Sequence, residues 1–190
     1  LFGLKMLTTL IPEYKKEFPG VTIEISETNL PTIQKMILEE SIDCAVIALN
    51  DVAAFDKNQL ELIGQEEVLL GIPATHPYAV ENGHNPITWD DFARIFKDDN
   101  FILSKKASTL RVLSDKIFSG IHFQPRTMCE TNSIITIRSM VEMGIGIEFI
   151  AKTCAADHQN IKYYSMQPPI WRKIAFVHRK GWIQNAPEQA

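Results

Sequence analysis

Three short polar segments carry the side chains in this chain that are best suited to hold a small ligand. They are ETNL at 27–30, SKKAST at 104–109 and ETNS at 130–133. Each follows a stretch with a strand pattern and precedes one with a helix pattern. In open α/β sheets, ligands bind beyond the carboxyl ends of strands, where helix N-termini present unpaired N–H groups. Helix capping alone also explains these residue types, but three such segments in one chain favour a shared binding cleft.

Residues that could carry out catalysis do not form a catalytic pattern. No histidine lies four residues from another or beside a candidate nucleophile, which holds for His76, His84, His122, His158 and His178. Adjacent acidic residues cannot converge on one substrate, and this applies to the pairs Glu39/Glu40, Asp90/Asp91 and Asp98/Asp99. The sequence contains no GxSxG elbow, P-loop or HExxH motif. We therefore expect no catalytic residues and no enzyme activity.

Metal and cofactor motifs are missing from the sequence as well. The three cysteines form no CxxC pair and no cluster with histidine, so we expect neither a metal site nor a disulfide framework at Cys44, Cys129 and Cys154. The GIG motif at 144–146 follows a helix pattern and leads into a strand, the reverse of the order in a dinucleotide-binding fingerprint. A left-handed helix C-cap at Gly144 explains it better. We expect no cofactor.

The composition is that of a folded domain with no general affinity for nucleic acid. Of the 190 residues, 45% are hydrophobic and 22% are charged, and the net charge is −4. A mildly acidic chain is not attracted to a phosphate backbone. No apolar run approaches the ~20 residues of a membrane span, and no signal peptide is visible. Free thiols fit a cytoplasmic setting. Because the sequence opens without an initiator Met, we expect it to be a fragment of a longer protein.

The elements that would position the polar segments alternate between helix and strand. An amphipathic stretch ends at FPG, and the alternation of apolar and polar residues then predicts a half-buried strand over Val21–Ile25. Pro31 suits the first turn of a helix, with Thr28 or Asn29 as its cap. The continuous apolar run Cys44–Leu49 is typical of a strand that is covered on both faces.

The second half repeats this rhythm. A strand is expected at Glu66–Pro73, and Thr88 with Asp91 forms an acidic variant of the capping box at the start of a helix. Phe101–Ser104 is predicted as a short buried strand, and Ser108 can cap the helix that follows it. Further strands are expected at TMCE, GIEFIA, IKYYSM and KIAFVHR. The alternation predicts an α/β fold with a mainly parallel sheet.

The sequence resembles the effector-binding domain of LysR-type transcriptional regulators over essentially its whole length. Four segments carry the resemblance, in the family's order and spacing: LIPEYKKEFPGVTIEI, ETNLPTIQKMILEESIDCAVI, EEVLLGIPATHPYA and CETNSIITIRSMVEMGIGIEFIA. Ser41 stands where the family usually has glycine. The resemblance implies two Rossmann-like α/β subdomains joined by two crossover segments, a fold like that of type II periplasmic binding proteins. Subdomain I would comprise 1–70 plus 162–190, and subdomain II 71–161.

The resemblance also implies a binding mechanism. A small effector would bind in the cleft between the subdomains and control DNA binding and transcription. A winged helix-turn-helix domain and a first strand would precede Leu1. The helix dipoles together with Lys105 favour an anionic effector. The ligand-binding residues that the resemblance implies are Thr28, Asn29, Leu30, Ile102, Ser104, Lys105, Thr131, Asn132 and Ser133, with Phe149 as an apolar wall.

The partners implied by the resemblance are the effector and a second copy of the chain. The expected assembly is a homodimer of cytoplasmic protein, or a tetramer when full-length. DNA would be contacted only through the N-terminal domain, and no membrane would be involved. Two alternatives stay open from the sequence: an extracytoplasmic solute-binding protein of a transporter, which shares the two-lobed cleft, and a small α/β enzyme. A helix-turn-helix upstream of Leu1 would favour the regulator, and a signal peptide the transporter.

Overall fold

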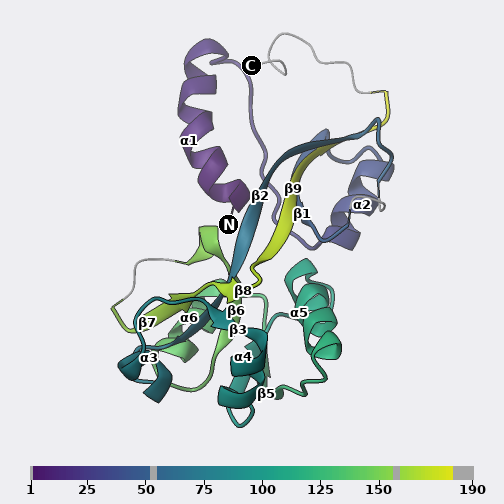
Figure 1. Cartoon of the computed structure of the whole chain (residues 1–190). Helices are drawn as coiled ribbons and strands as arrows, with labels where there is room; N and C mark the ends of the chain where they lie inside the picture. Colours follow the sequence, from purple (N-terminus) through teal and green to yellow (C-terminus); the bar gives the residue numbers. More distant parts are fainter. Residues whose placement is uncertain (1, 52–54, 156–158, 182–190) are drawn as a thin grey trace. The chain divides into compact units, whose positions relative to one another are not determined.

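Two compact units make up the chain, each with its own core. The computed structural model describes residues 2–51, 55–155 and 159–181 (Figure 1). Unit 1 is formed by residues 1–64 and 174–190, and unit 2 by residues 65–173. Both divisions fall within a long strand, because β2 (Leu60–Pro73) and β9 (Ile170–His178) each continue from one unit into the other. Two crossover segments are therefore present, as expected. The subdomain limits after residues 70 and 161 stay a prediction.

Unit 1 packs one helix against a small sheet. It contains α1 (Phe2–Glu17), α2 (Leu30–Leu38) and β1 (Cys44–Leu49), together with parts of β2 and β9. Its sheet has β9 between β1 and β2. The core consists of one residue from α2, two from β1 and two from β9, namely Ile37, Ile47, Leu49, Ala175 and Val177. These buried side chains hold the C-terminal end of α2 next to the sheet, while Leu30 and Ile33 of its first half pack partly buried against the same core.

The strand predicted at Val21–Ile25 is wrong. This segment has no assigned strand, and the apolar side chains of Ile23 and Ile25 are 38% and 47% exposed. Alternating residues can supply the apolar face of a strand, but a strand also needs a neighbouring backbone to satisfy its N–H and C=O groups. Among the described residues, no such neighbour pairs with this segment.

Unit 2 contains most of the elements. Along the chain they are α3 (Pro77–Glu81), β3 (Ile87–Thr88), α4 (Trp89–Ile95), β4 (Asn100–Leu103), α5 (Thr109–Gly120), β5 (Arg126–Glu130), α6 (Ile134–Glu142), β6 (Glu148–Ala151), the 3₁₀ turn η2 (Lys152–Cys154), β7 (Ile161–Tyr164) and β8 (Met166–Gln167). The pairs β4–β5 and β3–β8 are parallel, whereas β2 runs antiparallel to both β6 and β7. Unit 2 therefore combines two separate parallel pairs with an antiparallel sheet around β2, rather than one mainly parallel sheet, because the crossover strand β2 runs against the direction of β6 and β7.

An aromatic cluster forms the main core of unit 2. Phe92 of α4 is fully buried, and its ring centroid lies 5.1 Å from Phe123, 5.6 Å from Phe149 and 6.0 Å from Phe101. Phe118 of α5 completes the group. Burial of each such ring contributes roughly 1.5–3 kcal/mol. This packing clamps α4 and α5 onto β4 and β6, and so fixes where the segment after β4 begins.

The predicted helix boundaries of unit 2 are confirmed. The Thr88 hydroxyl accepts a hydrogen bond from the Asp91 N–H at 3.1 Å and donates to the Asp91 carboxylate at 2.9 Å. The Ser108 hydroxyl accepts from the Leu110 N–H at 3.3 Å and caps α5. Gly144 ends α6 with a φ of +72°, in the left-handed region that glycine adopts without strain.

Candidate functional site

The second and third polar segments are brought side by side by β4 and β5. The two strands are parallel, and Leu103 is opposite Glu130 in their register. Their carboxyl ends therefore lie at the same edge of the pair, and the two segments leave from there. The Thr131 N–H donates to the Leu103 carbonyl at 3.0 Å. The Lys105 N–H donates to Asn132 Oδ1, also at 3.0 Å. Residues 27 positions apart thus form one polar surface.

Each of these segments leads into a helix N-terminus. In the segment before α6, the Thr131 hydroxyl accepts from the Ser133 N–H at 3.1 Å. The Ser133 hydroxyl accepts from the Thr136 N–H at 3.3 Å and caps α6. Ser108 does the same for α5. Helix capping is therefore observed at both turns, and the two adjacent N-termini also place two positive dipole ends at this edge.

The buried side chain of Arg111 stabilises this edge of the β4–β5 pair through hydrogen bonds. Only 8% of Arg111 is exposed, and its guanidinium donates to the Ser104 carbonyl at 3.0 Å, to Glu130 at 2.7 Å and to Asp115 at 2.8 Å. Burial works against the charged guanidinium, but the hydrogen bonds that it donates to Asp115 and Glu130 outweigh burial and raise the pKa of Arg111. Arg111 thus ties α5 to both polar segments. The role of Arg111 could not be predicted from the sequence, because the position of an arginine in a helix gives no sign of a partner 19 residues away.

Lys105 supplies the exposed positive charge of the edge. Its side chain lies at the surface, and the structure records no ion pair between it and any other described residue. Arg111, by contrast, is neutralised by its two carboxylate partners. Ser104 is half-buried, whereas Asn132 and Ser133 are exposed. The edge therefore offers an exposed ammonium group at Lys105, hydroxyl and amide side chains and two helix N-termini, a set suited to a small anion.

Two of the expected ligand residues lie in the core. Ile102 and Phe149 are only 1% and 5% exposed. Phe149 stacks on Phe92 in the aromatic cluster, and Ile102 packs with Ile137 and Val141 of α6. The contacts that the structure shows for both residues are core contacts, and their part in a ligand pocket stays a prediction.

The first polar segment belongs to unit 1, where it begins α2. The Asn29 side chain accepts hydrogen bonds from the Thr32 N–H at 3.0 Å and from the Thr32 hydroxyl at 2.9 Å. Thr28 is exposed, and Leu30 packs partly against the unit 1 core. Of the two caps expected here, the structure selects Asn29.

Comparison with known proteins identifies the family. The pattern described as the LysR substrate binding domain matches residues 1–190. The chain belongs to the LysR substrate-binding domain family. Its relatives include a probable RuBisCO transcriptional regulator of Trieres chinensis, 29% identical over 164 residues, which cover 84% of this chain and 52% of the relative. Another is the transcriptional activator protein LysR of Escherichia coli strain K12, 25% identical over 159 residues, 83% of this chain and 48% of the relative. The chain thus spans about half the length of these curated relatives.

Solved structures confirm the fold of this LysR domain. The effector binding domain of QuiR in complex with shikimate has a TM-score of 0.77 and 21% identity, over 96% of this chain and 85% of that one. The Synechocystis PCC6803 CcmR regulatory domain in complex with 2-PG has a TM-score of 0.82 and 16% identity, over 98% and 88% of the two chains. The expected fold, two α/β subdomains of the type II periplasmic-binding-protein kind, is confirmed. The relatives named above are regulators rather than enzymes, and the transporter alternative is not favoured.

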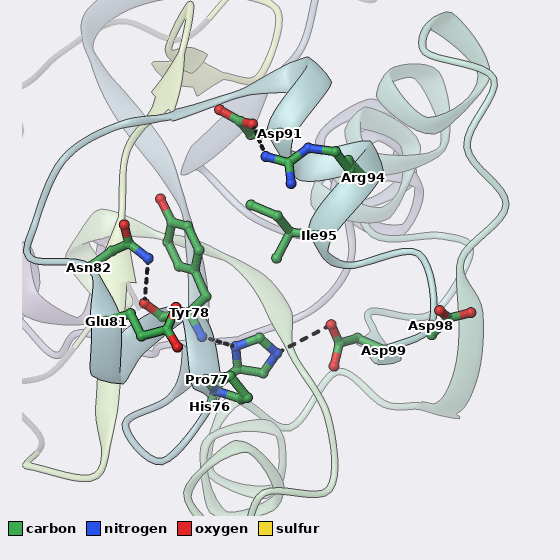
Figure 2. A pocket seen from close by; sticks show the side chains of 10 residues that line it. All are labelled: His76, Pro77, Tyr78, Glu81, Asn82, Asp91, Arg94, Ile95, Asp98 and Asp99. Atoms are coloured by element: carbon green, nitrogen blue, oxygen red, sulfur yellow. Dashed lines mark hydrogen bonds and ion pairs between the residues drawn. The ribbon is translucent and has the colours of Figure 1, made fainter.

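A separate hollow in unit 2 of the LysR domain does not suit an anion. It has a volume of about 710 Å³ (Figure 2) and is lined by His76, Pro77, Tyr78, Glu81, Asn82, Asp91, Arg94, Ile95, Asp98 and Asp99. Four carboxylates thus oppose one arginine, and that arginine already bonds to Asp91. A hydrogen bond from Arg94, with another from Thr88, lowers the pKa of Asp91. None of the expected ligand residues lines this hollow.

The described part of the chain has neither a cluster of metal-binding side chains nor a helix that could span a membrane. No group of three or more His, Cys, Asp or Glu side chains there could hold a metal ion. Likewise, no helix among residues 2–51, 55–155 and 159–181 is long and apolar enough to cross a membrane. His158 lies outside the described residues.

Proposed function

We propose that this LysR substrate-binding domain is the sensor of a transcription regulator and that its effector is a small anionic metabolite. The observation that carries the proposal is the joined polar edge of unit 2, where the backbone of Lys105 bonds to Asn132 and the two segments so joined lead into the N-termini of α5 and α6. Backbone N–H groups and a lysine at such a position attract carboxylate or phosphate oxygens. Related domains have been solved with shikimate and with 2-PG, and shikimate is a carboxylate.

The residues that we propose for effector binding come from both units. In unit 2, Ser104, Lys105 and Asn132 present polar groups at the edge, while the remaining candidates are Ile102, Thr131, Ser133 and Phe149. In unit 1, Thr28 has an exposed hydroxyl, and Asn29 and Leu30 adjoin it at the start of α2. An effector that binds one arrangement of the domain more tightly than another shifts the population toward it. That shift is the proposed signal to transcription.

The proposed setting follows from the family. We infer that the full-length protein is cytoplasmic and is a homodimer or tetramer. It would bind DNA through an N-terminal winged helix-turn-helix domain and would not engage a membrane. The substrate-binding domain itself would bind and release its effector without chemical change, since the residues proposed for the site offer hydrogen bonds and a positive charge rather than a nucleophile with a base.

A thermal-shift titration of the 190-residue domain tests the proposal, with shikimate, 2-PG and a panel of small carboxylates as probes. A probe at 100 times its Kd should add ~2.7 kcal/mol of stability. Lys105→Ala, Ser104→Ala or Thr28→Val should abolish the shift of any probe that binds. The matched controls are Lys116→Ala and Thr22→Val, which change exposed side chains of the same types outside the three polar segments. Retention of the full shift in Lys105→Ala and Ser104→Ala would refute the proposed edge.

A further inference from the structure

One carboxyl group of unit 2 lies in the core without a partner. Glu148 of β6 is 1% exposed, and neither of its carboxyl oxygens has a hydrogen-bond partner among the described residues. Successive side chains of a strand point to opposite faces. Since Phe149 packs into the aromatic cluster, Glu148 faces the other side, where Ile137 and Val141 of α6 are buried. A charge is costly in such a place.

A glycine makes room for this side chain. Gly71 of β2 is opposite Glu148 on β6 and opposite Tyr163 on β7. A Cβ atom at Gly71 would lie 3.1 Å from Tyr163 Cε1 and 3.3 Å from Glu148 Cγ. The two side chains therefore close over the glycine from either side. The Tyr163 hydroxyl is also buried and has no hydrogen-bond partner among the described residues. Because Glu148 and Tyr163 fill the space over Gly71, the Glu148 carboxyl group has room there to bind only a proton.

The surrounding charges do not compensate for burial. The charge of Arg138 on α6 acts on Glu148, whereas Tyr163 on β7 is influenced by Glu148, by Arg138 and Glu142 of α6 and by Cys154. Burial raises the pKa of Glu148 to about 8, although the charge of Arg138 acts in the opposite direction. Burial, together with the charge of Glu148, raises the pKa of Tyr163 to about 12, so the phenol stays neutral when Glu148 titrates.

We propose that Glu148 is a proton switch built into unit 2. The folded domain holds its side chain as the neutral acid, and loss of that proton weakens the packing of α6 against β6 and β7. Deprotonation breaks the O–H bond of the carboxyl group and releases the proton to solvent, which leaves a carboxylate among apolar side chains. The carboxylate can then be hydrated only if α6 or the end of β7 opens.

The test is the pH dependence of unfolding by denaturant, measured on the intact 190-residue chain between pH 5 and 9.5. In the folded chain the pKa of Glu148 lies near 8, against an ordinary value of 4.5. The folded state therefore binds the extra proton between these values. The stability that protonated Glu148 contributes is fully present below pH 4.5, and it is lost as the pH rises from there through 8. Within this window the folded-to-unfolded ratio should fall about tenfold per pH unit beyond the trend of Glu148→Gln, and level off above 8.

Two controls separate the switch from a general effect of pH. Glu67→Gln changes another buried carboxyl group, which is paired with Lys152 at 3.2 Å, and should keep the pH dependence of the native chain. Glu148→Leu should lack this pH dependence, as Glu148→Gln does. Either variant therefore serves as the reference if the other one folds poorly. Hydrogen exchange, corrected for its intrinsic pH dependence, should show faster opening of α6 above pH 8 in the native chain only.

An NMR titration measures the pKa of Glu148 directly in the native chain. The carboxyl carbon of Glu148, followed by NMR with selectively labelled glutamate, should titrate with a midpoint near pH 8. A midpoint near 4.5, or the same pH dependence of stability in native chain and Glu148→Gln, overturns the proposal. Equal α6 exchange at pH 7 and pH 9 would overturn the claim that the proton controls helix packing.

Discussion

The backbone N–H of Lys105 donates a hydrogen bond to the side-chain oxygen of Asn132 over 3.0 Å, across 27 residues of sequence. The two residues follow different strands, yet this bond makes their segments a single polar surface at the edge of β4 and β5. The bond also orients the backbone that carries the Lys105 ammonium. The proposed anion site therefore depends on Asn132 for the position of Lys105 as well as for the polar group of Asn132 itself.

Asn132→Ala should separate the two segments. Loss of one exposed hydrogen bond should lower the free energy of unfolding by about 0.5–1.5 kcal/mol. Any probe anion that stabilises the native domain should bind more weakly, since Lys105 is no longer held in place. Chemical denaturation and a thermal-shift titration measure the two effects. Asn160→Ala, at another exposed asparagine, is the control and should change neither. Unaltered anion binding in Asn132→Ala would show that the bond does not position the site.

Arg172→Met should be among the most damaging single changes in unit 2. The Glu66 side chain is 3% exposed, and its Oε1 accepts hydrogen bonds from Arg172 Nε at 2.7 Å and Nη2 at 2.6 Å. Its Oε2 accepts from the Thr153 hydroxyl at 2.6 Å. Removal of the arginine leaves a buried charge unpaired and should cost about 3–5 kcal/mol.

The double variant Glu66→Gln with Arg172→Met should recover much of that loss, because the uncompensated charge is gone. Lys173→Met, one residue along and exposed, should shift the free energy of unfolding by no more than about 0.5 kcal/mol. Denaturant unfolding of the four proteins measures this. A loss below 1 kcal/mol in Arg172→Met would mean that Glu66 finds water or another donor once the arginine is removed.

Gly146→Ala should strain the contact between β4 and the residues before β6. A Cβ atom at Gly146 would lie 2.7 Å from the Asn100 carbonyl oxygen, which accepts the Ile147 N–H at 2.9 Å. The backbone must move, and overpacking of this kind costs about 1–3 kcal/mol. Gly120→Ala has open space around its Cβ position and should be tolerated. Equal melting temperatures for the two variants would contradict the close approach.

Tyr163→Phe should be neutral or stabilising. The phenol oxygen is buried and has no partner among the described residues, so its removal leaves no donor behind. The variant should also lack one late-titrating tyrosine, since the pKa of Tyr163 is raised to about 12 by burial first and by Glu148 second. Denaturant unfolding and the tyrosinate absorbance at alkaline pH measure both points. A loss of more than 1 kcal/mol would reveal a hydrogen bond to this hydroxyl.

Local chemistry explains which features could be predicted from the sequence. The Thr88 and Ser108 caps, the Gly144 C-cap and the strand at Cys44–Leu49 depend on residues within a few positions of one another. Hydroxyl capping, the positive φ of glycine and apolar runs are properties of short segments. The polar segments after β4 and β5 were found for the same reason. The family resemblance in addition gave the fold, which the structural comparisons confirm.

The tertiary structure decided the features that join distant segments. Arg111 with Glu130, Glu66 with Arg172, and Glu148 with Tyr163 over Gly71 carry no signal in sequence spacing, because strand register and helix packing bring them together. The same physics explains the failure at Val21–Ile25, where the pattern was right for a strand but pairing with another backbone was missing. A sequence determines the local preference of each segment, but burial and partnership are set only when segments far apart in the chain meet.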